Sequence, residues 1–131
     1  PRPDLNKARR TSFIGRLTGW IFPNNLPHAI RVSGRAACAR RKSRKAMKYF
    51  DKAIAAAMKI GADYEHARAL IDKSMLDYPE AQSDREKGLE LLESLGCVLP
   101  DAEVEYLAFD RSEHHARAAA AREQQSQKTD P

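Results

Sequence analysis

Apolar residues recur every three or four positions along most of the chain, which is the period of an amphipathic α-helix. The strongest run spans about 44–59, and Gly61 follows it as a residue suited to a helix stop. A helix is predicted before it from Pro27 to about residue 40, and Ser43 is expected to act as the N-cap of the second helix. No alternating run typical of a β-strand occurs. The pattern therefore predicts an all-α fold of antiparallel helix pairs.

Three further helices are predicted along the rest of the chain. The first covers about 63–77, with Tyr64 facing inward, and ends before Pro79. Ser83 and Glu86 form an S-x-x-E sequence typical of a capping box, which predicts a helix to about residue 95. The last helix is expected to start at Pro100 and Asp101.

These elements divide the chain into four segments. They are a basic amphipathic helix over 1–25, the helix pairs over 26–99, a C-terminal helix over 100–123, and a tail over 124–131 that is expected to be disordered. The first segment carries an apolar face at helical spacing: Phe13, Ile14, Leu17, Trp20 and Ile21. We expect this face to pack on the helix that begins at Pro27. An exposed Trp20 would instead favour binding to an anionic membrane or to a partner.

Small and aromatic residues in the first helix pair follow a repeat spacing. Gly34 is followed twelve residues later by the sequence A-x3-F-x2-A, formed by Ala46, Phe50 and Ala53, and Ile30 precedes Gly34 by one turn. The same offsets occur in tetratricopeptide repeats. We expect Gly34 and Ala46 to lie where the two helices approach most closely, and Phe50 and Ala53 to meet the next pair.

A weaker second copy follows about 40 residues later. Leu70 and Ser74 correspond to Ile30 and Gly34, and Gly88 and Leu92 correspond to Ala46 and Phe50. The sequence predicts helix pairs stacked as a short α-solenoid. The alternative is a generic helical bundle in which small residues match by accident.

Residues 26–71, LPHAIRVSGRAACARRKSRKAMKYFDKAIAAAMKIGADYEHARALI, resemble the tetratricopeptide-type repeats of large multidomain signalling ATPases and of regulators that carry kinase or cyclase domains. The resemblance implies a scaffold for protein–protein interaction within a larger signalling protein. It carries no catalytic activity over to this chain, because nothing in the sequence corresponds to an ATPase, kinase or cyclase domain.

Charge is distributed unevenly along the chain. Residues 1–50 hold 13 Lys and Arg against one acid, and residues 51–131 hold 10 against 17 acids, so formal charges of +12 and −7 lie side by side. Such a division predicts an anionic partner for the first half or attraction between the two halves.

Cys38 and Cys97 lack metal or redox spacing and are interpreted as reduced thiols of a cytoplasmic protein.

Residues with catalytic or metal-binding spacing are missing from the sequence. It contains no phosphate-binding loop and no G-x-S-x-G or H-E-x-x-H motif. His114 and His115 are adjacent on a predicted helix and point in different directions, so we expect no metal site there. The expectation is a protein that is not an enzyme and needs no cofactor.

Three functions remain in competition. The leading one is a protein-interaction scaffold in which Arg31 and Arg35, one turn apart, line a groove and hold the carboxylates of an acidic peptide. The second is nucleic-acid binding, in which the basic cluster at 40–45 would dominate. The third and weakest is membrane binding by the N-terminal segment.

Overall fold

The computed structural model describes residues 25–129, apart from the side chains of residues 109, 110 and 129. Every regular element in this range is an α-helix: α2 (Leu26–Ala39), α3 (Ser43–Ile60), α4 (Asp63–Lys73), α5 (Ala81–Ser94) and α6 (Asp101–Thr129). The all-α prediction is confirmed. The predicted helix at the N-terminus, including Trp20, lies outside the described residues.

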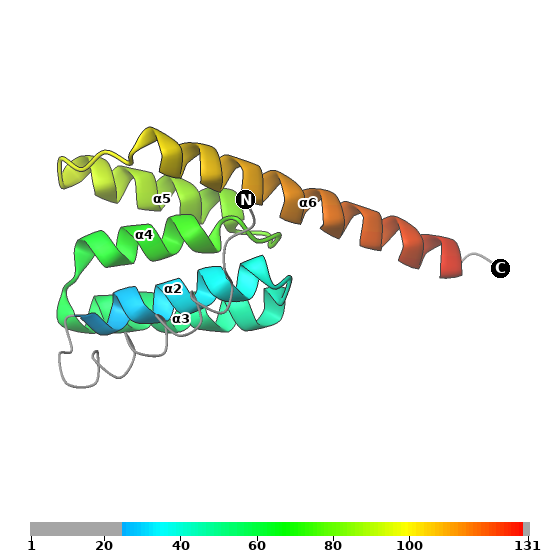
Figure 1. Ribbon diagram of the computed structural model, residues 1–131, viewed down its shortest axis with the longest axis horizontal. Helices are drawn as coiled ribbons and strands as arrows, with labels where there is room; N and C mark the ends of the chain where they lie inside the picture. The colour runs from blue at the N-terminus through cyan, green and yellow to red at the C-terminus, as the bar shows by residue number, and fades with distance from the viewer. Residues whose placement is uncertain (1–24, 130–131) are drawn as a thin grey trace.

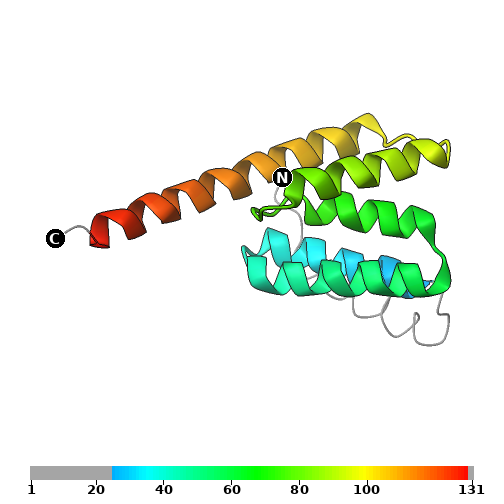
Figure 2. The ribbon, with the colours of Figure 1, turned by 180° about the vertical axis from the view of Figure 1, so that it is seen from behind.

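The helices are arranged in layers (Figure 1). The closest packing joins α2 to α3 and α4 to α5, and α3 also lies against α4. From both sides, α4 is seen between the first pair and the layer that contains α5 and α6 (Figures 1 and 2). Helix α6 continues past the ends of the other helices, so its C-terminal part projects from the body.

Two glycines end helices in the left-handed conformation, and the first of them is the helix stop expected at Gly61. Gly61 follows α3 with a φ of 66°, and Gly96 follows α5 with a φ of 67°. A residue with a Cβ atom is strained in this region, whereas glycine is not. Both positions therefore fix the point at which the chain turns back to form the next helix.

Helix α4 is shorter than its apolar pattern predicts. It ends at Lys73 instead of residue 77, because the next backbone amides bond to carbonyls three residues back: Met75 to Asp72 and Leu76 to Lys73. The Ser74 hydroxyl adds a bond to the carbonyl of Ile71. The apolar residues after position 73 are buried in this tighter turn.

The two serines expected to act as N-caps do not do so. Ser43 is the first helical residue of α3, and Ser83 lies inside the first turn of α5. Neither helix has a side-chain cap. Glu86 of the expected capping box accepts a hydrogen bond from the Gln82 amide instead, at 2.9 Å. The capping-box interpretation is therefore wrong.

Helix α6 extends six residues beyond the expected boundary at 123 and ends at Thr129. The segment from 116 is rich in Ala, Arg, Gln and Lys, which have high helix propensity. The tail from residue 124 was expected to be disordered because it has few apolar residues. Its part up to Thr129 is instead helical, and the few apolar residues fit a helix that projects into solvent.

The core lies between the helix pairs and is built largely from alanine. Phe50 and Ile71 are its largest members with no exposed surface. The residues assigned to the repeat are all buried except Ile30, which is half-buried: Gly34, Ala46, Phe50, Ala53, Leu70, Ser74, Gly88 and Leu92. Any helical bundle would bury these positions, so the repeat assignment stays a prediction. The inward orientation predicted for Tyr64 is wrong, because its side chain is exposed.

Glycines set the closest approaches in both pairs. A Cβ atom added to Gly34 would lie 2.5 Å from Cε1 of Phe50, and one added to Gly88 would lie 2.7 Å from Cγ1 of Ile71. The nearest neighbours of Gly34 are thus atoms of Phe50, one turn along α3 from the expected Ala46. Each contact leaves no room for a methyl group.

We expect Gly34→Ala to lower the free energy of unfolding by about 1–3 kcal/mol, because the added methyl group forces the Phe50 ring out of its position. Urea unfolding measures this change. The control is Ala55→Leu, which enlarges an exposed residue of α3 and should change stability by less than about 0.5 kcal/mol. Equal effects of the two substitutions would contradict the close contact.

Candidate partner-binding site

Arg31 on α2 is buried and forms ion pairs with α4. Its Nη1 donates to Oδ2 of Asp72 at 2.9 Å, and its Nε donates to Oε2 of Glu65 at 3.0 Å. Arg31 is 3% exposed, and Asp72 has no exposed surface. The guanidinium therefore holds carboxylates as the sequence predicts, but they belong to the same chain. Because Arg31 is buried, the expectation that it meets a partner peptide is wrong.

Arg35, one turn along α2, is also engaged inside the molecule. Its Nη1 donates to Oε1 of Glu103 on α6 at 2.7 Å, and Nη2 of Arg68 on α4 donates to the same oxygen at 2.5 Å. The guanidinium of Arg35 also lies 4.6 Å from the centre of the Tyr106 ring. A single carboxylate of α6 thus joins arginines of two helices.

Ionisation of this cluster follows from burial and from the neighbouring charges. Burial raises the pKa of Asp72 above its ordinary value, against the opposing effects of Arg31, Arg35 and Arg68. For Glu65, burial also favours the neutral form, but the hydrogen bond with His28 and the charge of Arg31 outweigh it. The pKa of Glu65 is therefore lowered.

A second group of cations lies at the turn between α2 and α3 and faces solvent. This basic surface consists of Arg41, Lys42, Arg44, Lys45 and Lys48, all of them exposed. Lys45 lies 5.9 Å from the centre of the Tyr49 ring. Arg41, Arg44 and Lys48 have no carboxylate partner within residues 25–129. They are therefore available to an external anion.

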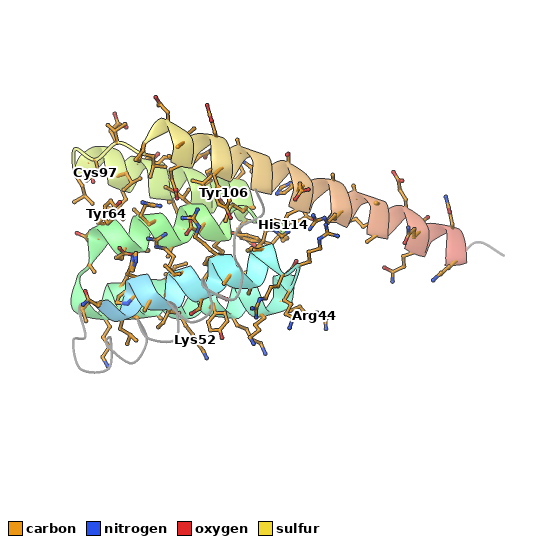
Figure 3. All side chains as sticks on the ribbon, in the orientation of Figure 1. Arg44, Lys52, Tyr64, Cys97, Tyr106 and His114 are labelled. Atoms are coloured by element: carbon orange, nitrogen blue, oxygen red, sulfur yellow. The ribbon has the colours of Figure 1, made fainter. Side chains whose placement is uncertain are left out.

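A cleft of about 620 Å³ opens beside this basic surface. Its lining combines apolar side chains with cations and comes from the α2–α3 turn, the start of α3, the segment that follows α4, and α6: Arg41, Ser43, Arg44, Met47, Lys48, Leu76, Asp77, His114, Arg117 and Ala118. Figure 3 shows Arg44 and His114 at this end of the helices, and Tyr64 and Cys97 at the opposite end. The cleft can accommodate an apolar group next to a negative charge.

Not every charged group at the cleft is unpaired. Arg117 forms an ion pair with Glu113, one turn away on α6, at 3.0 Å. Asp77 is paired with Arg122 of the same helix. Among the cations that line the cleft, those without a carboxylate partner in the described range therefore lie on the α2–α3 turn and the first turns of α3.

Sequence reasoning identified the basic cluster but not the cleft. The sequence predicts the basic cluster at 40–45, whereas residues 76–77 and 114–118 carry no signal that they share a site with it. The three segments are brought together only when α6 lies across the ends of α3 and α4. His114 lines this cleft.

Among the described residues, no group of three or more His, Cys, Asp or Glu is placed to hold a metal ion. Within the same range, no helix is long and apolar enough to cross a membrane. Cys38 and Cys97 form no disulfide.

We expect Arg31→Ala to lower the free energy of unfolding by about 3–5 kcal/mol, because it leaves the buried carboxylate of Asp72 without its ion pair. The exposed Arg44→Ala serves as the control, with a change of less than about 0.5 kcal/mol expected in urea unfolding. The internal role of Arg31 would be refuted if both variants were equally stable.

A pH dependence follows from the lowered pKa of Glu65. A carboxylate with a lowered pKa stabilises the folded state above its ordinary value of 4.5, and this contribution disappears as pH falls through the lowered value. The stability difference between the wild type and Glu65→Gln should therefore shrink as the pH falls below 4.5. Asp72 titrates in both proteins, so the comparison isolates Glu65. A difference that stays constant in urea unfolding over this range would contradict the assignment.

Comparisons with protein-family models, with curated proteins and with solved structures yield no match to this chain. The resemblance to tetratricopeptide-type repeats therefore remains a prediction that depends on the residues at 26–71. The candidate site is accordingly interpreted from its geometry and charge.

Proposed function

We propose that the chain is a non-enzymatic helical scaffold that binds an acidic segment of a partner protein. The observation that carries this proposal is the group of unpaired cations at the α2–α3 turn, beside a cleft with an apolar lining. A partner with carboxylates would neutralise Arg41, Arg44 and Lys48, for which the described residues provide no carboxylate partner.

The proposed binding surface lies at the exposed cations of residues 41–48, and not in the groove expected at Arg31 and Arg35. Arg31 and Arg35 already hold carboxylates of α4 and α6, so their loss would first disturb the fold. The cations at 41–48 are exposed and have no comparable structural task. We therefore assign partner binding to the basic surface and a structural role to the two inner arginines.

The composition of the cleft favours a peptide over a nucleic acid. Proteins that bind single-stranded nucleic acid stack the bases on aromatic side chains, and the lining of this cleft has no Phe, Tyr or Trp. Met47, Leu76 and Ala118 instead offer an apolar surface that suits an aliphatic or aromatic side chain. Nucleic-acid binding remains the alternative function.

The helix pairs α2/α3 and α4/α5 support the scaffold interpretation. Their packing order is the one expected for stacked repeats, in which each pair buries its apolar face against the next. We propose that this stack is a short tetratricopeptide-like α-solenoid that belongs to a larger regulatory protein. On this interpretation, α6 covers the exposed end of the second pair.

Binding of three probes to the full chain tests the proposed function: a set of glutamate-rich peptides, a DNA oligonucleotide and vesicles that contain anionic lipid. We expect peptides to bind at about 0.15 M salt, and Arg44→Glu/Lys48→Glu to reduce their affinity at least about tenfold. The control is Lys59→Glu/Lys87→Glu, which makes the same charge change at exposed positions outside the cleft. This control should leave the affinity within about twofold.

Fluorescence anisotropy and vesicle sedimentation measure the three affinities. Tighter binding of DNA than of any acidic peptide would overturn the proposal in favour of nucleic-acid recognition. In that case each phosphate contact that is lost should reduce the salt dependence of binding by about one unit. Binding to vesicles alone would favour the membrane alternative.

A further inference from the structure

Arg41 occupies a backbone position that ordinarily favours glycine. Its φ is 60°, and it is the only residue other than glycine with a positive φ among those described. The amide of Arg41 bonds to the carbonyl of Cys38 at 2.8 Å, and that of Lys42 bonds to the carbonyl of Ala37 at 3.0 Å. These two bonds form a Schellman motif at the end of α2, in which the left-handed residue is usually glycine.

The other helix stops in the described range show what local geometry selects. Gly61 and Gly96 also have a positive φ, and both are glycine. An arginine in the left-handed region is strained, because its Cβ atom crowds the backbone. The backbone of the turn therefore does not account for Arg41. The arginine side chain lies at the cleft without a carboxylate partner among the described residues.

The cations are arranged around an apolar centre. Arg41, Arg44 and Lys48 all line the cleft, and Met47 and Leu76 contribute its apolar surface. Met47 also packs against the hydrophobic core, which ties the cleft to a rigid part of the molecule. A ligand that suits this arrangement has one apolar side chain flanked by negative charges.

We propose that Arg41, Arg44 and Lys48 hold the carboxylates of an acidic peptide while one aliphatic or aromatic side chain of that peptide enters the cleft beside Met47 and Leu76. This inference rests on the proposed function and deepens it, because it names the partner chemistry and the position of an apolar anchor. The occupant is an acidic segment of a partner protein. Charge complementarity to three unpaired cations is the reason for this choice.

A panel of short fluorescent peptides tests the anchor on the full chain. Each peptide has a central phenylalanine, leucine or alanine, flanked on both sides by glutamates or by glutamines. We expect the glutamate peptides with phenylalanine or leucine to bind about tenfold more tightly than those with alanine, because burial of a large apolar side chain strengthens binding. Replacing the glutamates with glutamines should weaken binding by a similar factor.

Two variants separate the cleft from the charges. Ala118→Leu fills the cleft from α6 without changing a charge, and Ala119→Leu makes the same substitution at the neighbouring exposed position. Ala118→Leu should remove the advantage of the phenylalanine peptide over the alanine peptide. Ala119→Leu should keep it.

Arg41→Gly tests the arginine without straining the turn. Glycine adopts the left-handed conformation freely, so the melting temperature should not fall. The affinity for the glutamate peptides should nevertheless fall about fivefold, because one cation is lost. An unchanged affinity would show that Arg41 is not part of the site and would overturn the inference.

The outcomes distinguish this inference from the function on which it rests. If glutamate peptides bind equally well whether their centre is phenylalanine or alanine, the apolar anchor is wrong but the acidic partner stands. If no glutamate peptide binds, both proposals fail. If the phenylalanine peptide retains its advantage in Ala118→Leu, it binds elsewhere on the chain, and the cleft assignment fails.

Discussion

The ion pair between Arg31 and Asp72 joins α2 to α4 in a place that water does not reach. Charged groups lose their hydration when they are buried, and the attraction of the nearby arginines offsets only part of this loss at Asp72, whose pKa stays raised. The pairing fixes α2 against α4, and it adds to the larger contact that α3 and α4 make between the two helix pairs. Glu103 extends the same network to α6 through Arg35 and Arg68.

This network divides the cations of the chain into two groups with different tasks. The inner arginines neutralise acids of the second half, so part of the opposition between the +12 and −7 segments is resolved by attraction within the chain. The outer group at 41–48 stays exposed, and within the described part of the chain Arg41, Arg44 and Lys48 have no carboxylate partner. Attraction between the two halves, one of the two explanations that the sequence offers for its charge asymmetry, therefore applies to the inner arginines. An anionic partner for the outer group remains a proposal.

Local features of the fold are readable from the sequence because they depend on neighbouring residues. The stops at Gly61 and Gly96 and the burial of Phe50 belong to this class. Partners that are distant along the chain are not readable in this way. Arg31 and Asp72 are 41 residues apart, and the sequence alone does not show that the arginine turns toward the core instead of a groove. Asp72 directly follows the apolar pair Leu70 and Ile71, and this was the one available signal of a buried acid.

The cleft was beyond sequence reasoning for a similar reason. Its lining comes from three separate segments, and α6 is joined to the rest of the chain by Glu103 near its start, by the buried Leu107 and by Arg122 farther along. The strained backbone of Arg41 is likewise a property of the folded turn. The sequence contains the cations, but their separation into paired and unpaired groups appears only in three dimensions.

Backbone hydrogen exchange of the full chain, with and without a saturating acidic peptide, tests the division of the cations most directly. The account predicts added protection at residues 41–48 and 114–118, with no change at residues 28–35 and no loss of protection along α6. Added protection at residues 28–35, together with faster exchange in α6, would show that a partner displaces Glu103 from Arg35 and Arg68. That result would contradict the assignment of the inner arginines to the fold and of the outer cations to the partner.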